Sequence, residues 1–178
     1  AVGAWTYPLY NNGTTMLAFA KKGGRWGSEQ APSVTALIEQ ETALGVLDPQ
    51  RVIDSLHTAL VDSVAAIRAY LDGARAQGLT VAGYGAASRT AALLTSADVT
   101  TADVAMIADA STAKHGRTMP GTRIPIVSPD DLVAARPDRV LLFISDLLPE
   151  VRRAMPGIEE NGGRWVVVDP VPTEVEPQ

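Results

Sequence analysis

The chain has 178 residues, of which 46% are hydrophobic and 20% charged, and its net charge is −5 at pH 7. This composition is typical of one globular domain with appendages, and its strand-sized apolar runs exclude a membrane span. The chain has no cysteine, two histidines and no long basic run, which excludes a disulfide framework, a thiolate nucleophile, a Cys/His zinc site and a nucleic-acid partner. We therefore expect a soluble, cytoplasmic protein.

Residues 1–31 show no long helical period. The apolar run 16–20 lies between turn-forming residues 11–13 and two glycines at 23 and 24, which predicts a short hairpin or an edge strand. Trp5 and Trp26 flank this run and cover either a neighbouring domain or the chain's own core. The chain opens without Met or a signal segment, so we expect it to be trimmed from something longer.

Two helices are predicted next. Pro32 and Ser33 begin the first, with Ser33 as its cap, and Gly45 ends it. Asp48 caps the second, which continues to Gly78. The apolar residues of this second helix recur at three-or-four spacing, as in an amphipathic helix: Ile53, Leu56, Leu60, Val64, Ile67, Leu71 and Ala74.

A glycine-rich turn follows a short buried strand at residues 81–82. Gly83 and Gly85 permit a sharp bend and a close approach of backbone N–H groups to an anion. Ser88 occupies the third position of the motif and is expected to cap a helix that extends to residue 96. The motif predicts a phosphate-binding turn, and the alternative is a plain strand-to-helix turn that binds nothing.

The next strand, residues 104–108, ends at Asp109. In dinucleotide-binding folds an acidic residue at this strand end accepts a ribose hydroxyl, and the alternative is an Asx turn. The loop 114–122 holds Lys114, His115 and Arg117 among two glycines and a proline. These basic side chains are suited to a diphosphate, whereas a solvated turn with incidental charges is the alternative.

The remaining elements alternate between strand and helix. Residues 124–127 predict an edge strand, Ser128 caps a helix, and residues 139–144 predict a central parallel strand that ends at Ser145 and Asp146. A short helix at 149–154 and a strand at 165–168 complete the pattern, and residues 171–178 are expected to be disordered. Short right-handed crossovers give an α/β, Rossmann-like fold, with a mostly parallel sheet, helices on both faces and a ligand crevice at the strand carboxyl ends.

Two stretches resemble the carboxyl-terminal domain of the deoxysugar C-methyltransferases. The family's G-Y-G-A-x-x-K-G-N-T-L-L-N corresponds to residues 83–95, and its D-x-x-x-x-K-x-G-x-x-x-P-G-x-x-I-P-I is matched in full. The matching residues of this second motif are Asp109, Lys114, Gly116, Pro120, Gly121, Ile124, Pro125 and Ile126. The resemblance covers residues 83–170 well and the preceding segments more loosely.

This resemblance implies a domain that helps to bind a nucleotide diphosphate sugar in deoxysugar biosynthesis. Family members also carry a zinc-binding domain and a central methyltransferase domain that uses S-adenosylmethionine and holds the catalytic residues. Residues 1–31 then resemble the tail of that methyltransferase domain, 32–170 form the carboxyl-terminal domain, and 171–178 form the tail. We expect no catalytic residue, metal or cofactor of this chain's own, and a methyltransferase domain as its partner in cis or in trans.

The ligand is expected to lie among the residues of these segments: Gly83, Tyr84, Gly85, Ala86, Ser88, Arg89, Thr90, Asp109, Lys114, His115, Arg117, Gly121, Thr122, Ser145 and Asp146. Two positions depart from the family, since K-G-N is replaced by residues 89–91 and W-N by residues 145–146. Two further functions remain open: an NAD(P)-type dinucleotide domain with Asp109 on the ribose, and a scaffold that binds no ligand and docks on a catalytic partner.

Overall fold

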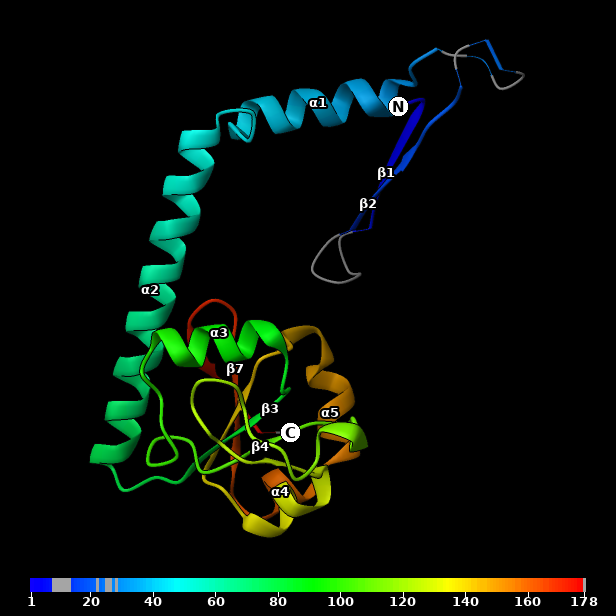
Figure 1. Ribbon diagram of the computed structural model, residues 1–178. Coiled ribbons are helices and arrows are strands. Elements are labelled where there is room, and N and C mark those ends of the chain that lie inside the picture. Colours follow the sequence, from blue (N-terminus) through cyan, green and yellow to red (C-terminus); the bar gives the residue numbers. More distant parts are fainter. Residues whose placement is uncertain (8–13, 22, 25–26, 28, 178) are drawn as a thin grey trace. The chain divides into compact units, whose positions relative to one another are not determined.

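Figure 1 shows the computed structural model of the chain, which describes residues 1–7, 14–21, 23–24, 27 and 29–177. The chain divides into two compact units, Ala1–Thr58 and Ala59–Gln178. Helix α2 (Pro49–Ala76) contributes residues to both units. The turn expected at residues 11–13 and the expected role of Trp26 lie outside the described residues.

The first unit contains the predicted hairpin. Strand β1 (Gly3–Tyr7) pairs with β2 (Thr14–Ala18) in antiparallel register, and helix α1 (Pro32–Leu44) follows. Gly45 ends α1 with φ at 77°, as predicted. The prediction that Ser33 caps α1 is wrong, because the cap position is Ala31 and the Ser33 hydroxyl instead accepts the Ala4 N–H at 3.2 Å. The hydroxyl thus ties α1 to the hairpin.

The second unit is built on a six-stranded sheet with the order β5-β4-β3-β6-β7-β8. Every neighbouring pair is parallel except β7 and β8, which confirms the predicted α/β fold with a mostly parallel sheet. The strands are β3 (Val81–Tyr84), β4 (Ile107–Ala108), β5 (Ile126–Val127), β6 (Arg139–Leu142), β7 (Arg164–Val168) and β8 (Pro172–Glu174). The chain order reverses between β3 and β6, which is where open α/β sheets bind ligands at their carboxyl ends.

Helices cover both faces of this sheet (Figure 1). On one face, α2 and α3 (Ser88–Ser96) bury Ile67, Leu71 and Leu94. On the other face, α4 (Pro129–Ala135), α5 (Leu148–Ala154) and α6 (Gly157–Glu160) pack around the fully buried Trp165. Two 3₁₀ turns, η1 (Thr112–Lys114) and η2 (Ser145–Leu147), follow β4 and β6. Among the described residues, no helix combines the length and apolar character that crossing a bilayer requires.

The apolar stripe of α2 packs on the sheet over only part of its length. Ile67 and Leu71 are 0% and 2% exposed, whereas Ile53 and Leu56 are 58% and 66% exposed. The predicted helix and its apolar spacing are confirmed, and the stripe is buried only in the second half of the helix. The cause is length, since the 28 residues of α2 span about 42 Å and the four-residue strand β3 spans only about 13 Å.

Two of the three helix caps predicted for α2, α3 and α4 are confirmed. The Asp48 carboxylate accepts two N–H groups of the first turn of α2, and Ser128 forms a reciprocal capping box with Asp131, both as predicted. Ser88 is not the cap of α3, because Ala87 holds that position without a side-chain hydrogen bond. The Ser88 side chain is exposed and lies in the first turn of the helix.

The carboxyl-terminal segment differs from the expected disordered tail. Pro172–Glu174 form β8, which pairs with β7 and completes the sheet. Glu174 Oε1 accepts a hydrogen bond from Arg139 Nε at 2.7 Å and one from the Tyr70 hydroxyl at 3.2 Å. These side chains, which lie far away in the sequence, hold the segment in place.

Candidate functional site

The glycine turn between β3 and α3 is shaped by close packing. Gly85 has φ at 100°, a conformation that side chains disfavour, and its carbonyl oxygen accepts the Thr90 hydroxyl at 2.8 Å. A Cβ at Gly83 would lie 3.1 Å from side-chain atoms of both Ile107 and Phe143. The two glycines are therefore required by the strand packing and the turn itself.

The inner side of this turn is filled by a carboxylate. Asp109 Oδ2 accepts the Ala86 N–H and the Lys114 ammonium, each at 2.8 Å, and Oδ1 accepts the Ser111 N–H at 2.9 Å. Lys114 Nζ also donates to the Ala86 carbonyl oxygen at 3.0 Å, and His115 Nε2 lies 2.7 Å from the Asp109 carbonyl oxygen. We call Ala86, Asp109, Lys114 and His115 the Asp109 cluster.

The Asp109 cluster is electrostatically balanced. Burial raises the pKa of Asp109, but the hydrogen bond from Lys114, the N–H groups of Ser111 and Ala86, and the charge of Lys114 together bring it below its usual value. The carboxylate is thus ionised at neutral pH and neutralises Lys114. An incoming anion would have to displace this internal one from the Ala86 N–H.

The rest of the predicted basic loop lies elsewhere. Arg117 and Gly121 are exposed, and a Cβ at Gly121, where φ is 80°, would collide with Thr95 in the last turn of α3. Thr122 Oγ1 accepts a long hydrogen bond, 3.5 Å, from Ile124 N in its own loop. Gly121 and Thr122 therefore lie toward the far end of α3 from the glycine turn.

Tyr84 belongs to the opposite face of the sheet. Tyr84 is 8% exposed, and its ring packs edge-on against Trp165, with ring centroids 6.4 Å apart. Burial first, and then the charges of Asp109 and Glu150, raise the pKa of its hydroxyl. The structure thus places this predicted site residue in the core that α4, α5 and α6 cover.

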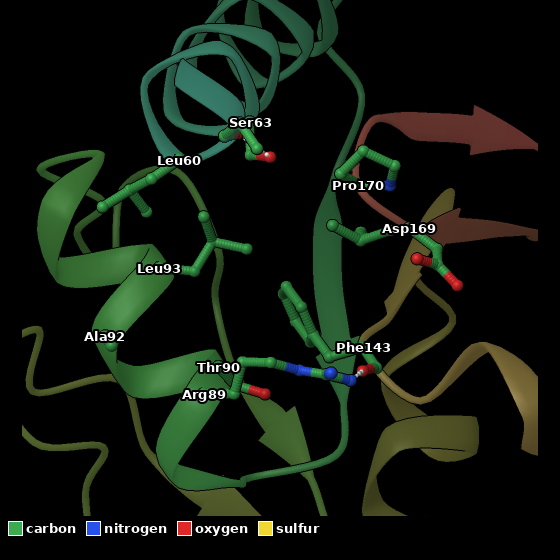
Figure 2. Close-up of a pocket in the computed structure, with 11 residues that line it drawn as sticks. Leu60, Ser63, Arg89, Thr90, Ala92, Leu93, Phe143, Asp169 and Pro170 are labelled. Atoms are coloured by element: carbon green, nitrogen blue, oxygen red, sulfur yellow. Dashed lines mark hydrogen bonds between the residues drawn. The ribbon is translucent and has the colours of Figure 1, made fainter. Parts of the chain in front are cut away.

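A cavity of about 290 Å³ opens beside the first turns of α3, and we call it the Arg89 cavity. Figure 2 shows Leu60 and Ser63 of α2 above it, Leu93 of α3 at its side and Phe143 beneath. The lining residues are Ala59, Leu60, Ser63, Arg89, Thr90, Ala92, Leu93, Phe143, Val168, Asp169 and Pro170. Its position is the carboxyl end of β6 and β7, next to the point where the strand order reverses.

Arg89 is the cation of this cavity. Its side chain extends along the lower edge toward Phe143, and Nη2 donates to the Phe143 carbonyl oxygen over a long 3.5 Å (Figure 2). Among the residues that the structure describes, no carboxylate forms an ion pair with Arg89. Most of the guanidinium's five N–H donors are thus available to an anion.

Ser145 and Asp146 follow β6 near the same edge of the sheet. The Ser145 hydroxyl lies 2.6 Å from Asp169 Oδ2 and 3.3 Å from Asp146 Oδ1. Because Asp169 lines the Arg89 cavity, this hydroxyl links the predicted pair to the cavity wall. In the described part of the chain, no three acidic or histidine side chains gather as metal ligands would.

The structure therefore separates the predicted site into parts. The Asp109 cluster holds Ala86, Asp109, Lys114 and His115, and the cavity takes Arg89 and Thr90 from the glycine stretch. Sequence reasoning missed the cavity residues Leu60, Leu93, Phe143 and Asp169. The position of Asp169 after the last parallel strand was a usable signal, whereas Leu60 looked like an ordinary core residue.

The amino-acid sequence of the chain is similar to a known protein family and to a characterised relative. The sequence model of the C-methyltransferase C-terminal domain family matches residues 11–172, which include the glycine turn, the Asp109 cluster and the cavity. The chain is 35% identical over 108 residues to the C-methyltransferase NovU of Streptomyces niveus. That match covers 61% of this chain and 26% of the relative, so the chain spans about a quarter of the relative's length.

Proposed function

Because the chain belongs to the C-methyltransferase C-terminal domain family, we propose that it is the substrate-binding domain of a sugar C-methyltransferase. In this proposal it holds a nucleotide diphosphate sugar of deoxysugar biosynthesis in the cytoplasm. Methyl transfer from S-adenosylmethionine belongs to a separate methyltransferase domain, in cis or in trans. This chain contributes binding and orientation of the substrate, and no catalytic residue.

The observation that carries the proposal is Arg89 at the carboxyl edge of the sheet, whose guanidinium has no ion-pair partner within the described part of the chain. Open α/β sheets bind ligands in the crevice where the strand order reverses, and β3 and β6 form that point here. A guanidinium with free donors next to an apolar cavity favours a ligand that joins an anionic group to a less polar body. A nucleotide diphosphate sugar has this character.

The exposed apolar side chains of the first unit support a partner domain. Leu47 is 65% exposed, Leu56 is 66% exposed, and Phe19 is 76% exposed. Large apolar side chains that are this exposed are candidates for surfaces that other proteins cover. In the proposal, the methyltransferase domain covers them.

The competing NAD(P)-type function receives less support. That function requires the Asp109 carboxylate to accept a ribose hydroxyl and the glycine turn to accept a pyrophosphate. Here the same carboxylate already accepts the Ala86 N–H and pairs with Lys114. A dinucleotide would have to displace both contacts.

Calorimetric titration of the chain with a thymidine diphosphate sugar, NAD and S-adenosylmethionine tests the proposal. We expect heat of binding only with the nucleotide sugar. The contacts of Asp109 with Ala86 and Lys114 obstruct a dinucleotide such as NAD, and the proposal places S-adenosylmethionine in another domain. Tight binding of NAD would replace the proposal with the dinucleotide function. The absence of binding by all three ligands would leave only the docking scaffold.

A further inference from the structure

We infer that the Arg89 cavity holds the base of the nucleotide, with the diphosphate on the Arg89 guanidinium rather than in the Asp109 cluster. This inference rests on the proposed function and assigns the parts of the substrate to places in the fold. It predicts that the domain recognises the nucleotide half of the ligand. The sugar half then extends beyond the diphosphate and away from the cavity.

The first argument is the chemistry of the cavity walls. The two hydroxyls in the lining are already engaged, since Ser63 donates to the Ala59 carbonyl oxygen at 2.7 Å and Thr90 to the Gly85 carbonyl oxygen at 2.8 Å. The walls between them are mostly aliphatic and aromatic carbon (Figure 2). A sugar ring carries hydroxyls on all sides and would lose their hydrogen bonds to water there, whereas a base has its polar groups on its edge alone and its faces lose none.

The second argument is size. A cavity of about 290 Å³ lies near the lower limit for small-molecule sites. It has room for one compact ring system, so the diphosphate and the hexose of a nucleotide sugar must extend outside it. The cavity therefore takes one end of the ligand, and its apolar walls select the base.

The third argument is the availability of cations. Lys114 also lies beside the glycine turn, but Asp109 Oδ2 binds its ammonium at 2.8 Å. Arg89 has no such partner among the described residues, and Figure 2 shows its guanidinium at the edge of the cavity. A diphosphate bound at Arg89 gains a charge-assisted, two-point contact without breaking an internal ion pair.

Titration of the intact chain with thymidine 5′-diphosphate tests this placement, with two variants that address the two halves of the site. Arg89→Gln removes the cation, and Ala59→Trp places an indole at the cavity from an exposed helix position. We expect each variant to weaken binding by about tenfold or more, the scale of one lost charge-assisted contact. Matched controls are Arg153→Gln, an exposed arginine of α5, and Val61→Trp, an exposed residue of α2 that does not line this cavity.

The outcomes separate this inference from the proposed function. Weakening by Arg89→Gln and Ala59→Trp, with both controls near wild type and all urea midpoints unchanged, supports the placement. Unchanged affinity of Ala59→Trp overturns it and leaves the proposed function standing, as does a loss of affinity in Lys114→Gln that Arg89→Gln does not show. If neither thymidine diphosphate nor its sugar conjugate binds to wild type, the proposed function itself fails.

Discussion

The surroundings of Lys114 and of Arg89 differ in one respect that decides their chemistry. Both cations lie beside the glycine turn, and the sequence alone assigns both to an anionic ligand. Lys114 donates to a buried carboxylate and to a backbone carbonyl oxygen, and its charge is used within the protein. Arg89 donates a long hydrogen bond to the Phe143 carbonyl oxygen and faces an apolar cavity.

The difference shows that a basic residue near a glycine-rich turn can bind an anionic ligand only if its charge is not already paired with a carboxylate of the protein. The Asp109 carboxylate occupies the place that a phosphate takes in a dinucleotide-binding turn, at the Ala86 N–H. A side chain of the protein thus accepts the backbone N–H group that the motif would offer to an anionic ligand. We expect the Asp109 cluster to contribute stability and Arg89 to contribute binding.

Replacement of Asp109 by Ala is expected to have the largest effect. It leaves the Ala86 and Ser111 N–H groups and the Lys114 ammonium without their acceptor, which costs about 2–3 kcal/mol of unfolding free energy. Urea denaturation measures this change. Asp62→Ala, at an exposed position of α2, is the control and should shift the free energy by less than about 0.5 kcal/mol.

The dependence of stability on pH tests the role of Asp109 a second time. Because the pKa of Asp109 is lowered in the folded state, its contribution is fully present above the ordinary carboxyl value near 4 and is lost as the pH falls through the folded pKa. The wild type should therefore lose stability between about pH 5 and pH 3 more steeply than Asp109→Ala does. Parallel acid profiles would contradict the assigned ion pair.

Replacement of Gly121 by Ala tests whether the basic loop has a packing role, with an intermediate effect. Both Gly121 and Gly116 have positive φ values, 80° and 76°, but only at Gly121 would a Cβ meet Thr95, while Gly116 has open space. We expect Gly121→Ala to cost about 2 kcal/mol and Gly116→Ala about 1 kcal/mol, because only the first adds a steric clash to the backbone strain. Equal thermal unfolding shifts would show that the loop does not pack on α3 as described.

Replacement of Arg89 by Gln is expected to have the smallest effect on stability. Its side chain is exposed and lacks an ion-pair partner among the described residues, so the unfolding free energy should change by less than about 0.5 kcal/mol. Urea denaturation beside Asp109→Ala makes the contrast direct. A loss comparable with that of Asp109→Ala would place Arg89 among the structural residues and remove the basis of the proposed site.

Much of the fold could be predicted from local patterns. The caps at Asp48 and Ser128, the end of α1 at Gly45 and the order of strands and helices all follow from residue chemistry within a few positions. The errors have a different origin. Ser33 bonds to Ala4, and Glu174 bonds to Arg139, so their roles depend on partners that are distant in the sequence.

The candidate site was likewise predictable where it depends on local patterns, and not where it depends on contacts between distant residues. Strand carboxyl ends pointed to Asp109 and Ser145, and the glycine motif pointed to Arg89. The motif could not reveal that Asp109 turns inward onto Ala86 and Lys114, or that Leu60 and Phe143 enclose a cavity beside Arg89. Each of those facts requires knowing which strands are neighbours.

The sequence by itself determined the α/β class, the mostly parallel sheet and the resemblance to a C-methyltransferase domain, because these depend on periodicity, turn chemistry and residue spacing along the chain. Only the tertiary structure decided which cation pairs with a carboxylate and which half of α2 is buried. Ion pairing and burial depend on distances across the fold of a few ångströms, and spacing along the chain does not fix those distances.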